Sequence, residues 1–387
     1  MQKINYNKQF IDHLDIKEVT KSLKSKLITT GPYIEKLENA FKKYLSVNEV
    51  ITCSSGTAAL YIAMRAINIK KDDVVIMPAI NFIASTNVAN ILGARIFLCD
   101  VDSRTGQITP ETLTDCIKIN KINKIKLVIT MYLGGTPYNI AKFYNLKKKY
   151  NFFLIEDSCH ALGASYRHKN KFVKIGGCLH SDISVFSLHP VKSITTGEGG
   201  VITTRSKSIG NKLRLLRSHG ILRNKKKYWE YDILSPTLNF RMSDVNAALG
   251  FSQLKKLPKF IKKRKEIANL YFKNLDNFKK IIKISKVDRD IISAYHLLII
   301  SFDFKKLSIS KNDLIKKLNK KNIFPQYHYI PIYKYTFYKN LNSPGNFKNS
   351  ENYYKSALSF PIYYKLEKKN LMKVFKCVKE ILIKHLK

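Results

Sequence analysis

Apolar and polar positions follow a regular order between about residue 50 and residue 205. Short apolar runs typical of buried strands are separated by longer stretches with the 3.6-residue period of helices. The predicted strands are EVITCSS (49–55), DVVIMPA (73–79), RIFLCDVD (95–102), KLVITMYL (126–133), FFLIEDS (152–158) and DISVFSL (182–188), and the predicted helices include GTAALYIAMRAI (56–67) and AKFYNLKKKY (141–150). This order predicts an α/β domain with a mainly parallel sheet, whose ligand sites lie at the carboxyl ends of the strands.

The pattern changes after about residue 250. A long basic amphipathic stretch (252–275) is followed by a strand-like run, SAYHLLIISF (293–302), a helix over 311–321 and a loop over 339–353. This order predicts a smaller α+β domain that is joined through the long helix. We therefore expect a large domain over residues 1–250, whose first 30 or so residues can pack with the small domain, and a small C-terminal domain over 251–387.

Length and composition indicate a globular protein with a sizeable core, since 45% of the 387 residues are apolar. The start of the chain has no apolar segment typical of a secretory signal, and no apolar run approaches the roughly 18 to 20 residues of a membrane helix. The six cysteines are scattered without CxxC pairs, so neither a metal site nor a disulfide framework is indicated. We expect a cytoplasmic protein with reduced thiols and no membrane partner.

The net charge of +41, from 69 Lys and Arg against 28 Asp and Glu, raises nucleic acid as a partner. The surplus is mostly lysine, is spread along the chain and accompanies an excess of Asn and Ile, which favours compositional drift. A DNA-binding regulator would need a helix-turn-helix or a basic patch with base-reading side chains, and the sequence contains neither pattern. We therefore expect no nucleic-acid partner, and the charge can assist the capture of an anionic substrate.

One lysine differs from the many lysines in exposed runs. Lys192 lies in SDISVFSLHPVKSITTGEGG (181–200), between a proline and a glycine turn, directly after a predicted strand. Asp157 lies at the end of FFLIEDS, where a carboxylate is costly unless a cation meets it, although a strand-end acid can also cap the next helix.

A third feature is the turn from strand to helix in CSSGTAALYIAM (53–64). Such a turn presents free backbone N–H groups and the positive end of the helix dipole to an anion. It has neither Walker A nor GxGxxG spacing, so a single phosphate fits better than a nucleotide, and capping alone would also explain its Ser, Gly and Thr. A lysine amine, a buried carboxylate and a cup for one phosphate are what pyridoxal phosphate requires.

Five separated segments resemble one known family in the family's order. They are LITTGPYIEKLE, CSSGTAALYIA, EDSCHALGASY, SVFSLHPVKSITTGEGG and LNFRMSDVNAALG, and the resemblance extends from about residue 3 to 385. The chain is identified by them as similar to the sugar-nucleotide aminotransferases of the DegT/DnrJ/EryC1/StrS family. This resemblance implies the PLP-dependent transferase fold of type I, like that of aspartate aminotransferase, and pyridoxal 5′-phosphate as the cofactor.

The resemblance also implies roles for individual residues. Lys192 would form the Schiff base with the cofactor and Asp157 would hold the pyridine nitrogen. His160 would touch the ring, Phe82 would stack on it, and the phosphate would be held by Thr57, Ala58, Ser187 and, from a neighbouring subunit, Asn239. That last role implies a homodimer with shared active sites. Candidate sugar contacts are Tyr6, Thr29, His328 and Tyr329, all of which could equally be ordinary buried polar residues.

Within the family, HPVKSITTGEGG, RSHGI (217–221) and YHYIPIYKY (327–335) are most similar to the branch that serves pseudaminic acid biosynthesis. The resemblance implies transfer of an amino group from L-glutamate to the C4 keto group of a UDP-linked 4-keto-6-deoxy-N-acetylhexosamine. Other UDP-, GDP- or dTDP-linked 4-keto sugars remain alternatives, because related enzymes share these segments. A dehydrating branch carries histidine in place of the lysine, and Lys192 argues against it.

Overall fold

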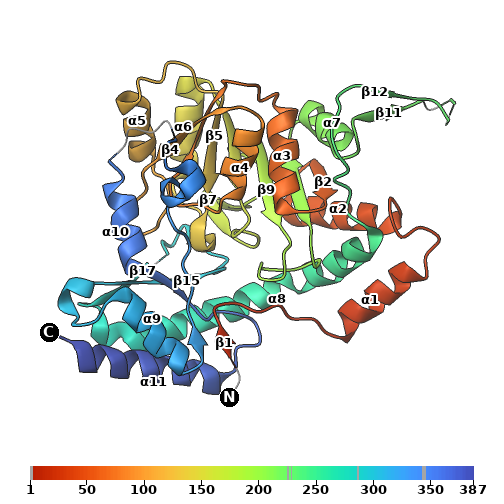
Figure 1. The fold of residues 1–387 in the computed structure, drawn as a ribbon. Coiled ribbons are helices and arrows are strands. Elements are labelled where there is room, and N and C mark those ends of the chain that lie inside the picture. Colours follow the sequence, from red (N-terminus) through yellow and green to blue (C-terminus); the bar gives the residue numbers. More distant parts are fainter. Residues whose placement is uncertain (1–2, 225, 228, 286, 342–345) are drawn as a thin grey trace.

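A seven-stranded sheet forms the centre of the protein, in the order β2-β10-β9-β6-β5-β3-β4 (Figure 1). The structure is a computed structural model that describes residues 3–224, 226–227, 229–285, 287–341 and 346–387. The strands are β2 (Glu49–Cys53), β3 (Val74–Pro78), β4 (Arg95–Cys99), β5 (Leu127–Met131), β6 (Phe153–Asp157), β9 (Ile183–Ser187) and β10 (Gly200–Thr204). Strands β9, β6, β5, β3 and β4 are parallel, whereas β10 is antiparallel to both β2 and β9.

Six of these strands confirm the alternating pattern, and β10 was not predicted. Its sequence, GVITT, is rich in β-branched residues, but it follows a glycine turn that was interpreted as a loop around Lys192. Because β10 returns antiparallel between β9 and β2, the carboxyl ends of β2, β9, β6, β5 and β3 all lie at one edge of the sheet. The predicted motifs at strand ends therefore meet at that edge.

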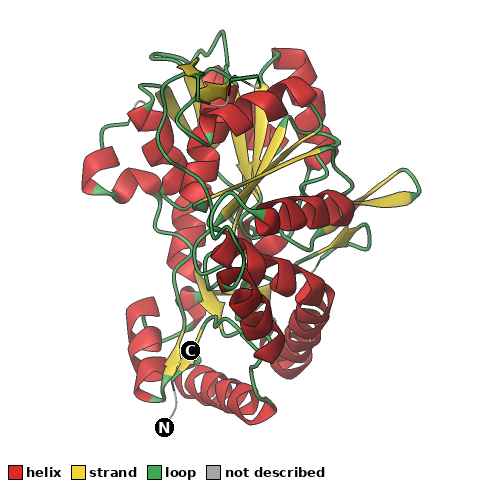
Figure 2. Cartoon of the chain, turned by 90° about the vertical axis from the view of Figure 1, so that its right-hand side faces the viewer, coloured by secondary structure: helices red, strands yellow, loops and turns green. Residues whose placement is uncertain are grey.

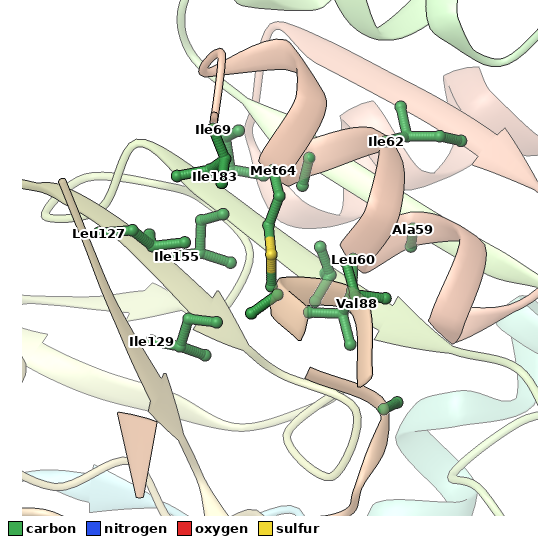
Figure 3. Close-up of a cluster of buried hydrophobic side chains, with 14 of the residues drawn as sticks. Ala59, Leu60, Ile62, Met64, Ile69, Val88, Leu127, Ile129, Ile155 and Ile183 are labelled. Atoms are coloured by element: carbon green, nitrogen blue, oxygen red, sulfur yellow. The ribbon is translucent and has the colours of Figure 1, made fainter. Parts of the chain in front are cut away.

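Helices cover both faces of this sheet (Figure 2). They are α2 (Pro32–Leu45), α3 (Gly56–Ala66), α4 (Ala84–Ile91), α5 (Pro110–Ile119), α6 (Ile140–Tyr150), α7 (Lys207–Leu216) and α8 (Asp244–Leu275). Alternate residues of β5 belong to different cores. Leu127 and Ile129 pack in one cluster with Met64 of α3 (Figure 3). Val128 belongs to another cluster, with residues of α5 and α6. Complete burial of such side chains stabilises the fold by about 1.5–3 kcal/mol each.

The C-terminal part contains a second, antiparallel sheet of three strands in the order β13-β15-β17. Its elements are β13 (Ile282–Ile284), β15 (Leu298–Phe302), α9 (Lys311–Lys320), β16 (Ile323–Phe324), α10 (Lys348–Ser356), β17 (Ala357–Phe360) and α11 (Lys368–His385). The N-terminal strand β1 (Ile4–Asn5) pairs in parallel with β16, and Ile4 is buried in this second core. The predicted domain boundary at residue 250 lies inside α8, a helix that runs from the large sheet to the second sheet. The division into two domains stays a prediction.

The remaining elements surround this framework. They are α1 (His13–Leu23), β7 (Ser165–His168), β8 (Lys171–Lys174), β11 (Ile221–Arg223), β12 (Tyr231–Ile233), β14 (Ile291–Ile292) and short 3₁₀ helices at Leu133–Gly135, Asp276–Phe278, Phe304–Lys306, Ile332–Lys334 and Thr336–Tyr338. Strands β11 and β12 form a hairpin that projects from the body at the upper right of Figure 1. No helix in the described ranges is both long and apolar enough to cross a membrane.

Three predictions for the C-terminal part need adjustment. The long helix begins at Asp244, before the basic stretch, because Ser243 caps it by accepting a hydrogen bond from the Asn246 N–H. The strand in SAYHLLIISF covers only Leu298–Phe302. The loop expected over 339–353 includes residues 342–345, which lie outside the described part, and its end is wrong because α10 begins at Lys348.

Candidate active site

The loop over residues 188–199, called the lysine loop below, connects β9 to β10 and carries Lys192. The Leu188 N–H donates to the Gly199 carbonyl over 2.8 Å, and the Leu188 carbonyl accepts from the Thr196 N–H over 3.0 Å, so the loop closes at its base. Gly197 has φ 81°, a left-handed conformation that glycine adopts without strain. The turn in TTGEGG therefore folds the loop back over the sheet edge.

The Lys192 side chain lies close to the carboxyl end of β6. Burial lowers the pKa of Lys192, while the neighbouring Cys159 and Asp157 act in the opposite direction. A lowered pKa increases the fraction of neutral amine, which is the nucleophilic form. This environment distinguishes Lys192 from the exposed lysines of the helices.

Asp157 is the last residue of β6 and is buried. The Cys159 N–H donates to its Oδ1 over 3.1 Å. Burial raises the pKa of Asp157, whereas the hydrogen bonding from Cys159 and the charge of Lys192 lower it. A buried carboxylate at this place is stabilised by any cationic N–H group that can reach it.

A histidine and a tyrosine from distant segments lie beside this pair. The Gly134 N–H donates to His160 Nδ1 over 3.4 Å, and His160 Nε2 lies 3.1 Å from the Tyr329 hydroxyl. Burial lowers the pKa of His160 well below its usual range, so the ring is neutral. Because Nδ1 accepts, the proton of the neutral ring is assigned to Nε2, which donates to Tyr329 and leaves the tyrosine O–H free to donate elsewhere.

His296 belongs to the same cluster and was not predicted. Its ring lies 4.1 Å from the His160 ring, centroid to centroid, and it is fully buried. Neither ring nitrogen has a hydrogen-bond partner within the part of the chain that the structure describes. The only signal in the sequence is a histidine inside the apolar run SAYHLLIISF, and such a residue is more often a core histidine than a functional one.

The residues predicted to hold a phosphate lie where β2 turns into α3 and where β9 ends. Ser55 caps α3, because its Oγ accepts from the Ala58 N–H over 3.0 Å. A Cβ added to Gly56 would lie only 2.8 Å from the Ser187 Cβ, so glycine is needed for the helix terminus to approach the end of β9. The N-terminus of α3, with the N–H of Thr57, therefore lies directly beside Ser187, an arrangement that suits one phosphate.

The structure brings three other predicted residues to the edge of this cluster. Phe82 follows β3, is 53% exposed, and its ring lies 5.8 Å from the Tyr329 ring. Tyr6 packs edge-to-face on the buried His328 ring at 4.9 Å, and His328 Nδ1 lies 2.9 Å from the Ser359 hydroxyl. Burial lowers the pKa of His328 to about 3, so this ring is also neutral.

Two predicted residues lie on exposed segments instead. Thr29 forms an isolated bridge with Ser243, and Asn239 forms one with Ser218. The Asn239 Oδ1 accepts from the Arg241 N–H over 3.1 Å. Among the described residues of one chain, no hydrogen bond or ion pair joins Thr29 or Asn239 to Lys192.

A model of the DegT/DnrJ/EryC1/StrS aminotransferase family matches residues 9–379. The chain belongs to this family. It is 36% identical over 369 residues to UDP-4-amino-4,6-dideoxy-N-acetyl-beta-L-altrosamine transaminase from Campylobacter jejuni subsp. jejuni serotype O:23/36 (strain 81-176), covering 95% of this chain and 94% of that one. The family resemblance inferred from five motifs is thereby confirmed, and the charge-based alternative explains none of these motifs.

Solved structures confirm the predicted fold. Helicobacter pylori PseC, an aminotransferase involved in the biosynthesis of pseudoaminic acid, superposes with a TM-score of 0.90 at 28% identity, covering 99% of this chain and all of that one. The PLP-form of Spr1654 from Streptococcus pneumoniae superposes with a TM-score of 0.88 at 26% identity, covering 99% of each chain.

Glu156, beside Asp157, offers a test of the core under the site. Burial raises the pKa of Glu156 to about 7, although Tyr132 donates a hydrogen bond to its Oε1 over 2.7 Å. The unfolded chain therefore loses this proton at lower pH than the folded one, so stability falls as pH rises from about 4.5 to 7. We expect Glu156→Gln to remove this loss. The free energy of unfolding of the variant relative to that of the wild type should therefore be about 2–3 kcal/mol higher at pH 8 than at pH 5.

Denaturant unfolding at the two pH values measures this difference. Glu266→Gln, at an exposed position of α8, is the matched control and should not change the pH dependence. If the free energy of unfolding depended on pH in the same way in both variants, the assignment to Glu156 would be contradicted.

Proposed function

We propose that this aminotransferase uses pyridoxal 5′-phosphate to move the amino group of L-glutamate to the C4 keto group of a UDP-linked 4-keto-6-deoxy-N-acetylhexosamine. The observation that carries the cofactor is the half-buried Lys192 beside the buried carboxylate of Asp157, at the sheet edge where α3 begins. The printed name of the C. jejuni relative and the PLP-form of Spr1654 support the substrate and the cofactor.

The residues at the sheet edge fit the groups of this cofactor. The phosphate would be held by Thr57, Ala58 and Ser187, at the helix terminus that Gly56 allows to approach the end of β9. Asp157 would accept a hydrogen bond from the pyridine nitrogen, which would supply the N–H partner that a buried carboxylate needs. When bound, the cofactor supplies an electron-poor ring that takes up the charge of a carbanion at the substrate carbon.

The surrounding side chains have separate tasks in this proposal. Lys192, as a neutral amine, would hold the cofactor and would serve as the base that moves a proton at the substrate carbon. His160, held neutral by burial, and Tyr329, its hydrogen-bonded neighbour, would orient the ring, and Phe82 would stack on it. The dry surroundings strengthen each of these polar contacts.

We further propose a homodimer with shared active sites in the cytoplasm. Asn239 and Thr29 lie on exposed segments, a placement that suits contacts to the phosphate and the sugar of a neighbouring copy. All six cysteines are free thiols, as is usual for proteins of a reducing compartment. Measurement of the molecular mass in solution tests the dimer. Recovery of transaminase activity on mixing Lys192→Ala and Asn239→Ala chains tests the shared active site.

The substrate is tested by incubating the purified protein with L-glutamate and a panel of UDP-, GDP- and dTDP-linked 4-keto sugars. We expect kcat/KM for the UDP-linked N-acetylated sugar to exceed that for the other nucleotides by about 10²-fold or more, since polar groups that recognise one nucleotide reject another. Mass spectrometry of the amino sugars gives the result. Equal use of a GDP- or dTDP-sugar would instead favour the alternative substrates.

His328→Ala is expected to raise KM for the 4-keto sugar about tenfold, the effect of losing one hydrogen bond, and to leave the glutamate half-reaction nearly unchanged. His328 lies between Tyr6 and Ser359, at the end of the site where the nucleotide-sugar would extend. Single-turnover spectroscopy with each substrate separates the two half-reactions. The exposed His13 provides a control, His13→Ala, and equal damage to both half-reactions would assign His328 to the fold or the cofactor.

A further inference from the structure

Asn7, on the segment that follows β1, is buried between three parts of the chain that are distant in sequence. Its Nδ2 donates to the Val191 carbonyl over 2.6 Å and to the His296 carbonyl, before β15, over 3.5 Å, and its Oδ1 accepts from Arg264 Nη2 over 3.0 Å. Val191 belongs to the lysine loop, and Arg264 belongs to α8. The sequence analysis assigned no role to Asn7 or to Arg264.

The Arg264 guanidinium determines which way the Asn7 amide points. It is buried, and its Nη1 donates to three carbonyls, those of Ile362 over 2.7 Å, His296 over 3.2 Å and Tyr295 over 3.3 Å. Burial lowers the pKa of Arg264 to about 10, so the group remains protonated at neutral pH and can only donate. The atom of Asn7 that faces Arg264 must therefore be the oxygen, and the amide nitrogen then faces Val191.

The Val191 carbonyl and the Lys192 N–H belong to the same planar peptide unit. The Lys192 N–H donates to the His189 carbonyl over 2.9 Å on one side of this unit, and Asn7 holds the carbonyl on the other side. Hydrogen bonds therefore fix both the carbonyl and the N–H of the peptide unit that precedes the Lys192 side chain. On the far side of the loop, Asn246 of α8 donates to the Thr196 carbonyl over 2.5 Å.

The same segment also carries Tyr6. The Tyr6 carbonyl accepts from the Ile362 N–H over 2.9 Å, and its ring lies against His328. Adjacent residues of one segment therefore contact the proposed sugar end of the site and the peptide unit of Lys192.

We infer that Asn7 is a positioning residue for Lys192, and that Arg264 acts through Asn7 by fixing the direction of its amide. This role rests on the proposed function of Lys192. Breaking the Asn7–Val191 bond should harm the lysine more than the fold, because the bond borders an open pocket of about 460 Å³ lined by residues that include Asn5, Asn7 and Val191. Water can then solvate the freed carbonyl.

Two variants separate this role from a merely structural one. Asn7→Asp keeps the acceptor for Arg264 but replaces the donor to the Val191 and His296 carbonyls with an oxygen, whereas Asn7→Leu removes every side-chain hydrogen bond of this position without adding charge. A change in the labelling rate of Lys192 that occurs in both variants cannot come from the charge, because only Asn7→Asp adds one. The matched control is Asn5→Asp, since Asn5 is exposed and lines the same pocket.

The readout is the reactivity of Lys192 in the cofactor-free protein, measured by trace acetylation with acetic anhydride between pH 6 and 10 and by peptide mass spectrometry. We expect both Asn7 variants to change the Lys192 labelling rate about fivefold, the effect of one lost hydrogen bond, relative to exposed lysines of the same sample. Asn5→Asp should match the wild type. Denaturant midpoints identify folded samples, and Asn7→Asp, which retains the Arg264 contact, is expected to be among them.

Wild-type labelling of Lys192 in folded Asn7→Asp would overturn the inference. The proposed function is tested separately in the wild type, by reducing the protein with borohydride in the presence of pyridoxal phosphate and locating the labelled peptide. Failure to find the cofactor on Lys192 would defeat the proposed function, whereas the acetylation result depends only on the contact between Asn7 and the lysine loop.

Discussion

Lys192→Ala is expected to reduce transamination by roughly 10³-fold or more, because one residue supplies both the amine that attaches the cofactor and the base that moves the proton. The variant should still fold, since the lysine loop is closed by backbone hydrogen bonds at Leu188 and Thr196 that do not involve the side chain. Absorbance after addition of pyridoxal phosphate, and steady-state turnover of glutamate, give the two measurements. The yellow colour of a covalent adduct should be absent.

A matched control for this variant is Lys279→Ala, at an exposed position after α8 that is distant in sequence from the lysine loop. It should retain the colour and the activity of the wild type. If the folded Lys192→Ala protein still converted glutamate at the wild-type rate, another amine would have to carry the chemistry.

Asp157→Asn is expected to retain the phosphate-anchored cofactor but to lose about 10²–10⁴-fold in turnover, a range typical of a removed acid–base or electrostatic partner. The asparagine side chain still offers an oxygen to the Cys159 N–H, the bond that Asp157 accepts over 3.1 Å, so a capping role would survive the substitution. An amide cannot sustain a protonated pyridine nitrogen. Affinity for pyridoxal phosphate and kcat, measured on the same sample, separate the two roles.

Asp115→Asn, on the exposed side of α5, removes one charge without touching the site and should be neutral. Near-normal turnover in Asp157→Asn would leave Asp157 only the role of capping the turn that follows β6. The histidines should not add a pH dependence near neutrality in either protein, because burial lowers the pKa of both His160 and His296 well below the usual range.

Local chemistry made much of the fold and of the site predictable. The alternation of apolar runs and helical periods located six strands of the central sheet, because a buried parallel strand must be apolar on both faces. Lys192 and Asp157 could be selected because a lone lysine in a loop and a carboxylate at a buried strand end both need a chemical reason. Strand β10 was missed because five residues after a glycine turn carry too little periodicity.

The contacts between distant segments were decided only by the tertiary structure. His296 lies 136 residues from His160 in the numbering, and the pair Asn7–Arg264 is separated by 257 positions, yet each pair is in contact. No local pattern marks such residues, since an asparagine in a strand-like segment and an arginine in a basic helix are ordinary in both places.

The sequence by itself therefore determined the family, the layered α/β architecture and the chemical groups at the strand ends, because these depend on periodicity and on residues close together in the chain. The tertiary structure decided the surroundings of those groups. These are the neutral histidines beside Lys192, the close approach of Gly56 to Ser187, and the hydrogen bond from Asn7 to the lysine loop. The physical reason is that desolvation and hydrogen-bond geometry depend on atoms brought together by folding, which have no fixed spacing in sequence.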